Sequence, residues 1–138
     1  MKGYLLDTHV PIWLMTDNVK LNKNIREDIE YFQNAYYVSV ETLREIVILQ
    51  LNKKIELKID SVISYLQSLQ VCIIDIDTDH IKELEKTPMI NIAGKTHEDP
   101  FDRMLIAQAI TNKLTIISSD GKFPFYKNYG LKLLVNEL

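Results

Sequence analysis

Short apolar segments recur along this chain, and the stretches between them have the apolar spacing of helices. Four of the segments are strongly β-like, and a fifth is weaker. They are residues 3–7 (GYLLD), 36–40 (YYVSV), 71–75 (VCIID), 114–118 (LTIIS) and, as the weaker one, 131–135 (LKLLV). Apolar residues occupy successive positions rather than alternate ones, which is typical of parallel strands covered by helices on both faces. This feature restricts the chain to layered α/β folds.

The apolar spacing between these segments predicts six helices. They cover residues 9–15, 22–34, 40–51, 59–69, 78–85 and 104–110, the last continuing a helix start at Pro100. The stripes that we expect to face the core are Ile25, Ile29 and Phe32 in the second helix, Val40, Leu43, Val47 and Leu51 in the third, and Ile59, Val62, Ile63, Leu66 and Leu69 in the fourth. Strands alternating with helices predict an α/β fold with a central, mostly parallel sheet of four to five strands.

Length and composition narrow the class of protein. The 138 residues suit a single domain over residues 1–138, and 46% apolar with 25% charged residues is typical of a soluble globular protein. No apolar run approaches the roughly 18 residues of a membrane span, and the first residues lack the features of a signal peptide, so we expect a cytoplasmic protein with no membrane segment. The single cysteine, Cys72, is expected to be a small buried apolar residue.

Acidic residues follow the predicted strands. They are Asp7 after the first strand, Glu41 and Glu45 after the second, Asp75 and Asp77 after the third, and Asp120 after the fourth. Asp102 opens the helix that leads into the fourth strand. Because ligands of open parallel sheets bind beyond the carboxyl ends of the strands, we expect several of these carboxylates to meet at one edge of the sheet.

Each of these acids also has a purely structural interpretation. Asp7 or the residue after it can cap the first helix, and Glu41 lies in a first helical turn, where an acid is favoured. Asp99 suits an N-cap position with Pro100 as the first helical residue. Asp120 precedes a glycine, which is a strong turn signal. Helical spacing alone assigns no special role to Glu45.

The acids are harder to explain as a set. Four carboxylates at one edge repel each other unless cations or protons are bound there. Mg²⁺ and Mn²⁺ prefer oxygen ligands of this kind. His9, His80 and His97 lack the paired spacing of zinc ligands, so we interpret none of them as one. The net charge of −3 disfavours a simple nucleic-acid binder but is compatible with an enzyme that acts on nucleic acid through metal ions.

Four segments together resemble the PIN-domain ribonucleases, and most closely the VapC-type toxins of type II toxin–antitoxin systems. These segments are LLDTHVPIWLM, SVETLREIVI, HEDPFDRMLIAQA and TIISSDGKFPFY. The resemblance spans nearly the whole chain, although residues 53–89 match only in the order of elements. It implies a three-layer α/β/α fold around the central sheet.

The resemblance also implies which residues form the site. The family's catalytic and metal-binding acids fall on Asp7, Glu45, Asp102 and Asp120, which selects Glu45 over Glu41. Auxiliary positions of the family fall on Ser118 and Asp99, with Asp99 also a candidate cap; Arg103, which lies beside Asp102, is a further auxiliary candidate from the sequence itself. Phosphate contacts are expected from Arg103, Lys122, Lys53 and Lys54. Two positions depart from the family's pattern: Arg44 replaces an aromatic residue, and Pro11 lies where an aliphatic residue is usual.

The function implied is metal-dependent hydrolysis of RNA phosphodiester bonds with Mg²⁺ or Mn²⁺, by the toxin of a toxin–antitoxin pair. A protein antitoxin and a homodimer are the implied partners. The alternative is a catalytically inactive PIN-like module that only binds its partner. A phosphatase of the aspartyl-phosphate type or a receiver domain fits less well, because both need paired acids at the first strand, where this chain has Asp7 followed by Thr8 and His9.

Overall fold

A five-stranded parallel sheet forms the centre of the protein, whose structure is a computed structural model that describes residues 2–138. Its strands are β1 (Gly3–Leu6), β2 (Ala35–Ser39), β3 (Cys72–Ile74), β6 (Thr115–Ser118) and β7 (Lys132–Val135), in the order β3-β2-β1-β6-β7. All four neighbouring pairs are parallel, which confirms the predicted sheet and includes the weaker fifth segment. Strands β4 (Asn91–Ile92) and β5 (Lys95–Thr96) form a separate antiparallel hairpin.

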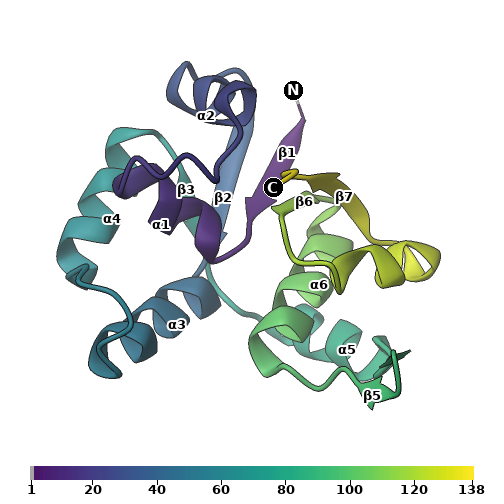
Figure 1. The fold of residues 1–138 in the computed structure, drawn as a ribbon. Helices are drawn as coiled ribbons and strands as arrows, with labels where there is room; N and C mark the ends of the chain where they lie inside the picture. The colour runs from purple at the N-terminus through teal and green to yellow at the C-terminus, as the bar shows by residue number, and fades with distance from the viewer. Residues whose placement is uncertain (1) are drawn as a thin grey trace.

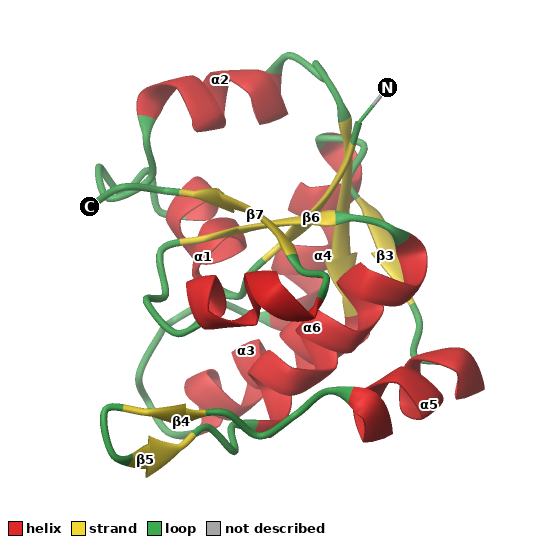
Figure 2. Cartoon of the chain, turned by 90° about the vertical axis from the view of Figure 1, so that its right-hand side faces the viewer, coloured by secondary structure: helices red, strands yellow, loops and turns green. Residues whose placement is uncertain are grey.

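Helices cover both faces of the sheet (Figures 1 and 2). They are α1 (His9–Met15), α2 (Lys23–Glu30), α3 (Val40–Leu51), α4 (Ile59–Ser68), α5 (Thr78–Lys86), α6 (Pro100–Asn112) and the 3-10 helix η1 (Phe123–Tyr129). Helices α1 to α4 lie on one side, and α6 and η1 lie on the other, with α5 against α6. This is the expected three-layer α/β/α arrangement. None of the helices in the described part of the chain is long and apolar enough to cross a membrane.

Neighbouring residues of the central strands explain the two apolar cores. In β1, Leu6 packs with α1 to α4, whereas Leu5 packs with α6 and η1. Strand β6 repeats the pattern with Ile117 and Ile116, which pair in register with Leu6 and Leu5. All four side chains are essentially inaccessible to water. Burial of each contributes roughly 1.5–3 kcal/mol, so continuous apolar strands are the expected sequence of a doubly covered sheet.

The second predicted helix is too long. Helix α2 ends at Glu30, not at residue 34, and Phe32 adopts a left-handed backbone conformation with φ of 55°. The amide of Phe32 donates to the Ile29 carbonyl, which closes the helix before β2 begins at Ala35. Ile25 and Ile29 are buried as predicted, but Phe32 is 45% exposed because the chain has already turned away.

The buried face of α3 also differs from the predicted stripe. Leu51 is 74% exposed, and the buried residues are Glu41, Thr42 and Ile46. Helix α3 contacts both α4 and α6, and Thr42 and Ile46 are buried beside the predicted stripe, of which Leu43 still packs against the core. Cys72, expected to be buried, is exposed on β3 because this strand forms one edge of the sheet.

Candidate functional site

Asp7 lies at the carboxyl edge of the sheet, between the ends of β1 and β6. Its backbone amide donates to the Ile117 carbonyl, which continues the β1–β6 pairing by one residue. This register places Asp7 beside Ser118, whose hydroxyl donates to Asp7 Oδ2 at 2.7 Å. The other oxygen, Oδ1, accepts the Thr8 amide at 2.7 Å. Both carboxylate oxygens therefore have fixed donors.

Ser118 also connects Asp7 to Asp120. The Ser118 Oγ accepts the backbone amide of Asp120 at 2.9 Å while its own proton points to Asp7. Asp120 Oδ1 accepts the amide of Lys122, which forms the turn predicted for this stretch. A depression of about 220 Å³ is lined by Asp7 and Asp120 together with His9, Trp13 and Ser119.

Glu45 reaches the same edge from α3. Ser39 caps this helix as predicted, since its hydroxyl accepts the Glu41 amide at 3.0 Å. Glu45 lies more than a turn further along, and its Oε1 accepts a hydrogen bond from the Thr8 hydroxyl. Thr8 is the N-cap residue of α1 but makes no side-chain capping bond, because its hydroxyl is engaged by Glu45.

Asp102 approaches from the first turn of α6. Asp99 caps this helix through Oδ1, which accepts the amides of Phe101 and Asp102, and Pro100 is the first helical residue as expected. The Oδ2 atom of Asp102 lies 3.0 Å from His97 Nε2, and His97 Nδ1 lies 2.7 Å from the Tyr126 hydroxyl. When the tyrosine hydroxyl donates to Nδ1, the Nε2 proton of a neutral imidazole faces the carboxylate.

Burial raises the proton affinity of these acids. Burial, opposed by the Ser118 and Thr8 hydrogen bonds, raises the pKa of Asp7. Burial is also the main cause of the raised pKa of Glu45, with Asp7 and Asp99 adding to it. The pKa of Asp102 rises to about 8, chiefly through burial and then through the nearby charges of Asp99, Asp7 and Asp120. The negative charges of neighbouring acids thus contribute to the raised pKa values of Glu45 and Asp102, as like charges in a shared site do.

The structure therefore brings Asp7, Glu45, Asp102 and Asp120 to one edge of the sheet, with Ser118 and Asp99 beside them. Other candidates are engaged elsewhere. Glu41 pairs with Arg44 at 2.6 Å, and the Arg44 guanidinium stacks 4.7 Å above the Phe101 ring, at the position where the resembled family has an aromatic residue. Asp77 caps α5, with its Oδ1 accepting the amides of Asp79 and His80.

Arg103, an expected phosphate contact, is engaged by backbone carbonyls in this structure. Its Nη2 donates to the Thr87 carbonyl, and the same atom lies 3.4 Å from the Leu84 carbonyl. These carbonyls lie at the end of α5, where the last helical carbonyls lack partners within the helix. Arg103 therefore joins α5 to α6, and its guanidinium faces the packing between these helices.

Three residues beside the acids were not singled out from the sequence. His97 and Thr8 contact Asp102 and Glu45, but neither has a recurring spacing that signals this, because their partners lie on other elements. Lys95 lies on the unpredicted β4–β5 hairpin, whose tight turn has positive φ at both Ala93 and Gly94. The only sequence signal for this hairpin is one glycine between two short segments.

The four acids lie near one another but do not form a closed metal-binding cage. Within residues 2–138, no three histidine, cysteine or acidic side chains are arranged closely enough to hold a metal ion by themselves. Hard cations do not require a closed set: Mg²⁺ commonly takes one or two carboxylates and keeps its other positions for water or phosphate oxygens. The four acids at this edge offer carboxylate oxygens, which suit such an ion.

Comparisons with known proteins identify relatives of the fold. A family model described as PIN domain matches residues 4–129. No curated protein matches the sequence. Among solved structures, VapBC2 from Rickettsia felis, bound to a DNA fragment from its promoter, is 19% identical with a TM-score of 0.67, covering 96% of this chain and 98% of that one. DNA-bound VapBC from Salmonella typhimurium is 17% identical with a TM-score of 0.69 and 99% coverage of both chains. VapBC-5 from Mycobacterium tuberculosis, a toxin–antitoxin system, is 17% identical with a TM-score of 0.62 and full coverage of both.

Proposed function

Because the chain belongs to the PIN domain family, we propose that it is a nuclease that hydrolyses RNA phosphodiester bonds with a divalent metal ion. The observation that carries this proposal is the convergence of four carboxylates from four separate elements at the carboxyl edge of the sheet. They are Asp7, Glu45, Asp102 and Asp120. A fold needs no such convergence for its stability, since buried like charges oppose folding.

The charge state of the site supports a bound cation. At neutral pH, a carboxyl group with a pKa of about 8, such as Asp102, retains its proton unless a positive charge compensates for burial and for the neighbouring acids. A divalent cation supplies that charge. We propose that Asp7 and Asp102 hold Mg²⁺ or Mn²⁺, and that Glu45 and Asp120 complete the site directly or through water.

When bound, the cation supplies Lewis-acid chemistry, lowering the pKa of water and offsetting negative charge on the phosphate. The protein positions the ligands. The Thr8 amide and Ser118 hydroxyl each hold one oxygen of Asp7, and His97 holds Oδ2 of Asp102. These bonds limit rotation of the two carboxylates, so their remaining lone pairs face the edge of the sheet in a reproducible arrangement.

We propose further that the protein is the toxin of a toxin–antitoxin pair, that a protein antitoxin binds it, and that it forms a homodimer. The three structural relatives are VapBC proteins of similar length, which supports an antitoxin partner. Co-purification with the product of a small neighbouring gene tests the partner, and light scattering of the pure chain tests the dimer. A monomer at micromolar concentration would contradict the dimer.

The nuclease proposal is tested with pure protein, structured RNA and either Mg²⁺ or Mn²⁺. We expect cleavage that stops with EDTA and in Asp7→Asn. Asp60→Asn is the matched control, because Asp60 is an exposed acid in the first turn of α4, away from the site. Cleavage that survives both EDTA and Asp7→Asn would refute the metal mechanism. A protein that binds its partner but neither metal nor RNA would instead be an inactive binding module.

A further inference from the structure

We propose that Lys95 and Lys122 bind a backbone phosphate of the RNA strand next to the one that is cleaved; this rests on the proposed nuclease function. The two lysines line a cavity of about 280 Å³ on the hairpin side of the acidic edge. We call this cavity the lysine pocket; it is lined by Ile92, Lys95, Thr96, His97, Glu98, Asp99 and Lys122.

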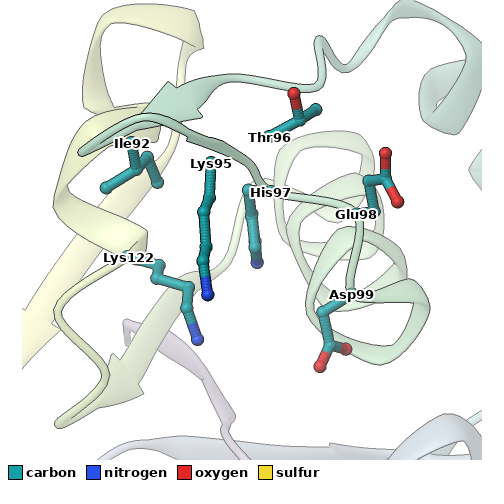
Figure 3. A pocket seen from close by; sticks show the side chains of 7 residues that line it. All are labelled: Ile92, Lys95, Thr96, His97, Glu98, Asp99 and Lys122. Carbon is teal, nitrogen blue, oxygen red and sulfur yellow. The ribbon is translucent and has the colours of Figure 1, made fainter.

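The two lysines come from separate elements and point the same way. In Figure 3 the Lys95 and Lys122 side chains extend toward the same side of the pocket that both line, and the His97 ring is drawn next to Lys95. Lys95 lies on β5, and Lys122 lies in the turn between β6 and η1. Two elements far apart in the sequence thus present positive charge at one point.

The hairpin holds the Lys95 backbone in place. Ile92 and Lys95 are paired across the two strands, and the Gly94 amide donates to Asn91 Oδ1 at 3.0 Å. The amide of His97 donates to the Ile90 carbonyl at 2.8 Å, which closes the base of the hairpin. The location of Lys95 beside the acidic edge is therefore a property of the fold.

The pocket shares a wall with the acidic site. His97 lines the pocket and lies 3.0 Å from the Asp102 carboxylate. Lys122 Nζ lies 3.9 Å from Asp120 Oδ2. A nucleic-acid strand whose cleaved phosphate lies against the carboxylates and their cation must place a flanking phosphate within reach of one side of the site, and the lysine pair occupies such a side.

The charges of the pocket favour an anionic occupant. Among the ion pairs of residues 2–138, none involves Lys95, and Lys122 has only the long contact with Asp120. Adjacent ammonium groups repel, and a phosphate relieves that repulsion. Neither acid of the pocket forms an ion pair with the two lysines: Asp99 accepts the capping bonds of α6 through Oδ1, and the Glu98 carboxylate points away from the lysines (Figure 3).

The test measures binding of a fluorescently labelled single-stranded RNA, with Mg²⁺ present, by anisotropy. Asp7→Asn serves as the background, so that the RNA stays intact. Adding Lys95→Gln and Lys122→Gln should weaken binding similarly for different RNA sequences and reduce the slope of log K against log salt concentration by about 0.7 to 1. The control pair is Lys2→Gln and Lys132→Gln, two exposed lysines at the amino ends of β1 and β7, on the opposite edge of the sheet, that remove the same charge.

Equal slope changes in the two double variants, or none in the lysine-pocket variant, would overturn the inference. So would an Asp7→Asn protein that does not bind RNA. If the double variant fails to fold, the single variants Lys95→Gln and Lys122→Gln answer the same question. Weakened binding to a partner protein with unchanged RNA binding would assign the pocket to an acidic peptide and would also overturn the inference. RNA cleavage by the unsubstituted chain is measured in a separate assay. Its result tests the nuclease proposal independently of the binding experiment on the lysine pocket.

Discussion

Replacing Asp102 by asparagine is expected to make the metal-free protein more stable. The carboxyl group of Asp102 lies next to Asp99, Asp7 and Asp120 in a mostly buried position, with 13% of its side chain exposed. Asparagine has nearly the same shape and can keep a hydrogen bond to His97, but it carries no charge. The substitution therefore removes a buried charge without leaving a cavity.

The sign and size follow from the pKa. The folded protein holds the Asp102 proton with a pKa of about 8, against an ordinary value of 3.8. A pKa raised by folding lowers stability as pH rises from the unfolded to the folded value, because the folded state must give up a tightly held proton. The full difference corresponds to about 6 kcal/mol. Two effects reduce the stability gained by the substitution: contact of Asp102 with solvent, and loss of a favourable first-turn charge in α6, worth about 0.5 kcal/mol. We therefore expect the free energy of unfolding to increase by at least about 2 kcal/mol above pH 8.

The assay is urea unfolding in EDTA at about pH 4.5 and about pH 8.5. Most of the expected loss of stability caused by ionisation of Asp102 occurs between these two pH values. The stability gain of Asp102→Asn should be small at the lower pH and reach its full value at the higher pH. Asp60→Asn, a first-turn acid of α4 that is exposed, should show no such increase. An Asp102→Asn protein that is no more stable than the unsubstituted chain at the higher pH, or a gain that is independent of pH, would refute the argument.

Three further outcomes are expected. Mn²⁺ at about 100 times its Kd should stabilise the protein by about 2.7 kcal/mol in thermal unfolding, and Asp7→Asn should abolish this shift; an equal shift in the variant would place the ion elsewhere. Tyr126→Phe removes the hydroxyl that contacts His97 and should lower Mn²⁺ affinity about tenfold by calorimetry, whereas unchanged affinity would limit Tyr126 to packing. Arg103→Met should cost about 2–3 kcal/mol in urea unfolding yet leave the salt dependence of RNA binding intact, and a reduced slope would restore Arg103 as a phosphate contact.

Local sequence signals predicted the features that depend on local contacts. Asp99 followed by Pro100 predicted the start of α6, and Ser39 predicted the cap of α3, because capping joins residues two or three positions apart. Periodicity predicted α1 with both of its ends but extended α2 into the turn that contains Phe32. That turn depends on where β2 must begin, which the helical spacing does not encode.

Helical periodicity could not decide whether Glu41 or Glu45 belongs to the site. Glu41 and Glu45 lie on the same flank of the predicted helix, and only the resemblance to the PIN family distinguished them. In the structure, Glu41 is held by Arg44, and Glu45 meets the Thr8 hydroxyl from a different element. His97 gave no sequence signal for its contact with Asp102, because the contact depends on the hairpin that brings it there.

The sequence by itself determined the order of elements, the parallel character of the sheet and the acids that follow its strands, since these depend on burial patterns and on residues close together in the chain. Tertiary structure alone decided which acids meet, how strongly each binds its proton, and that Lys95 lies beside them. The physical reason is that these properties arise from charges and donors on separate elements. Their distances depend on how strands and helices pack, and not on spacing along the chain.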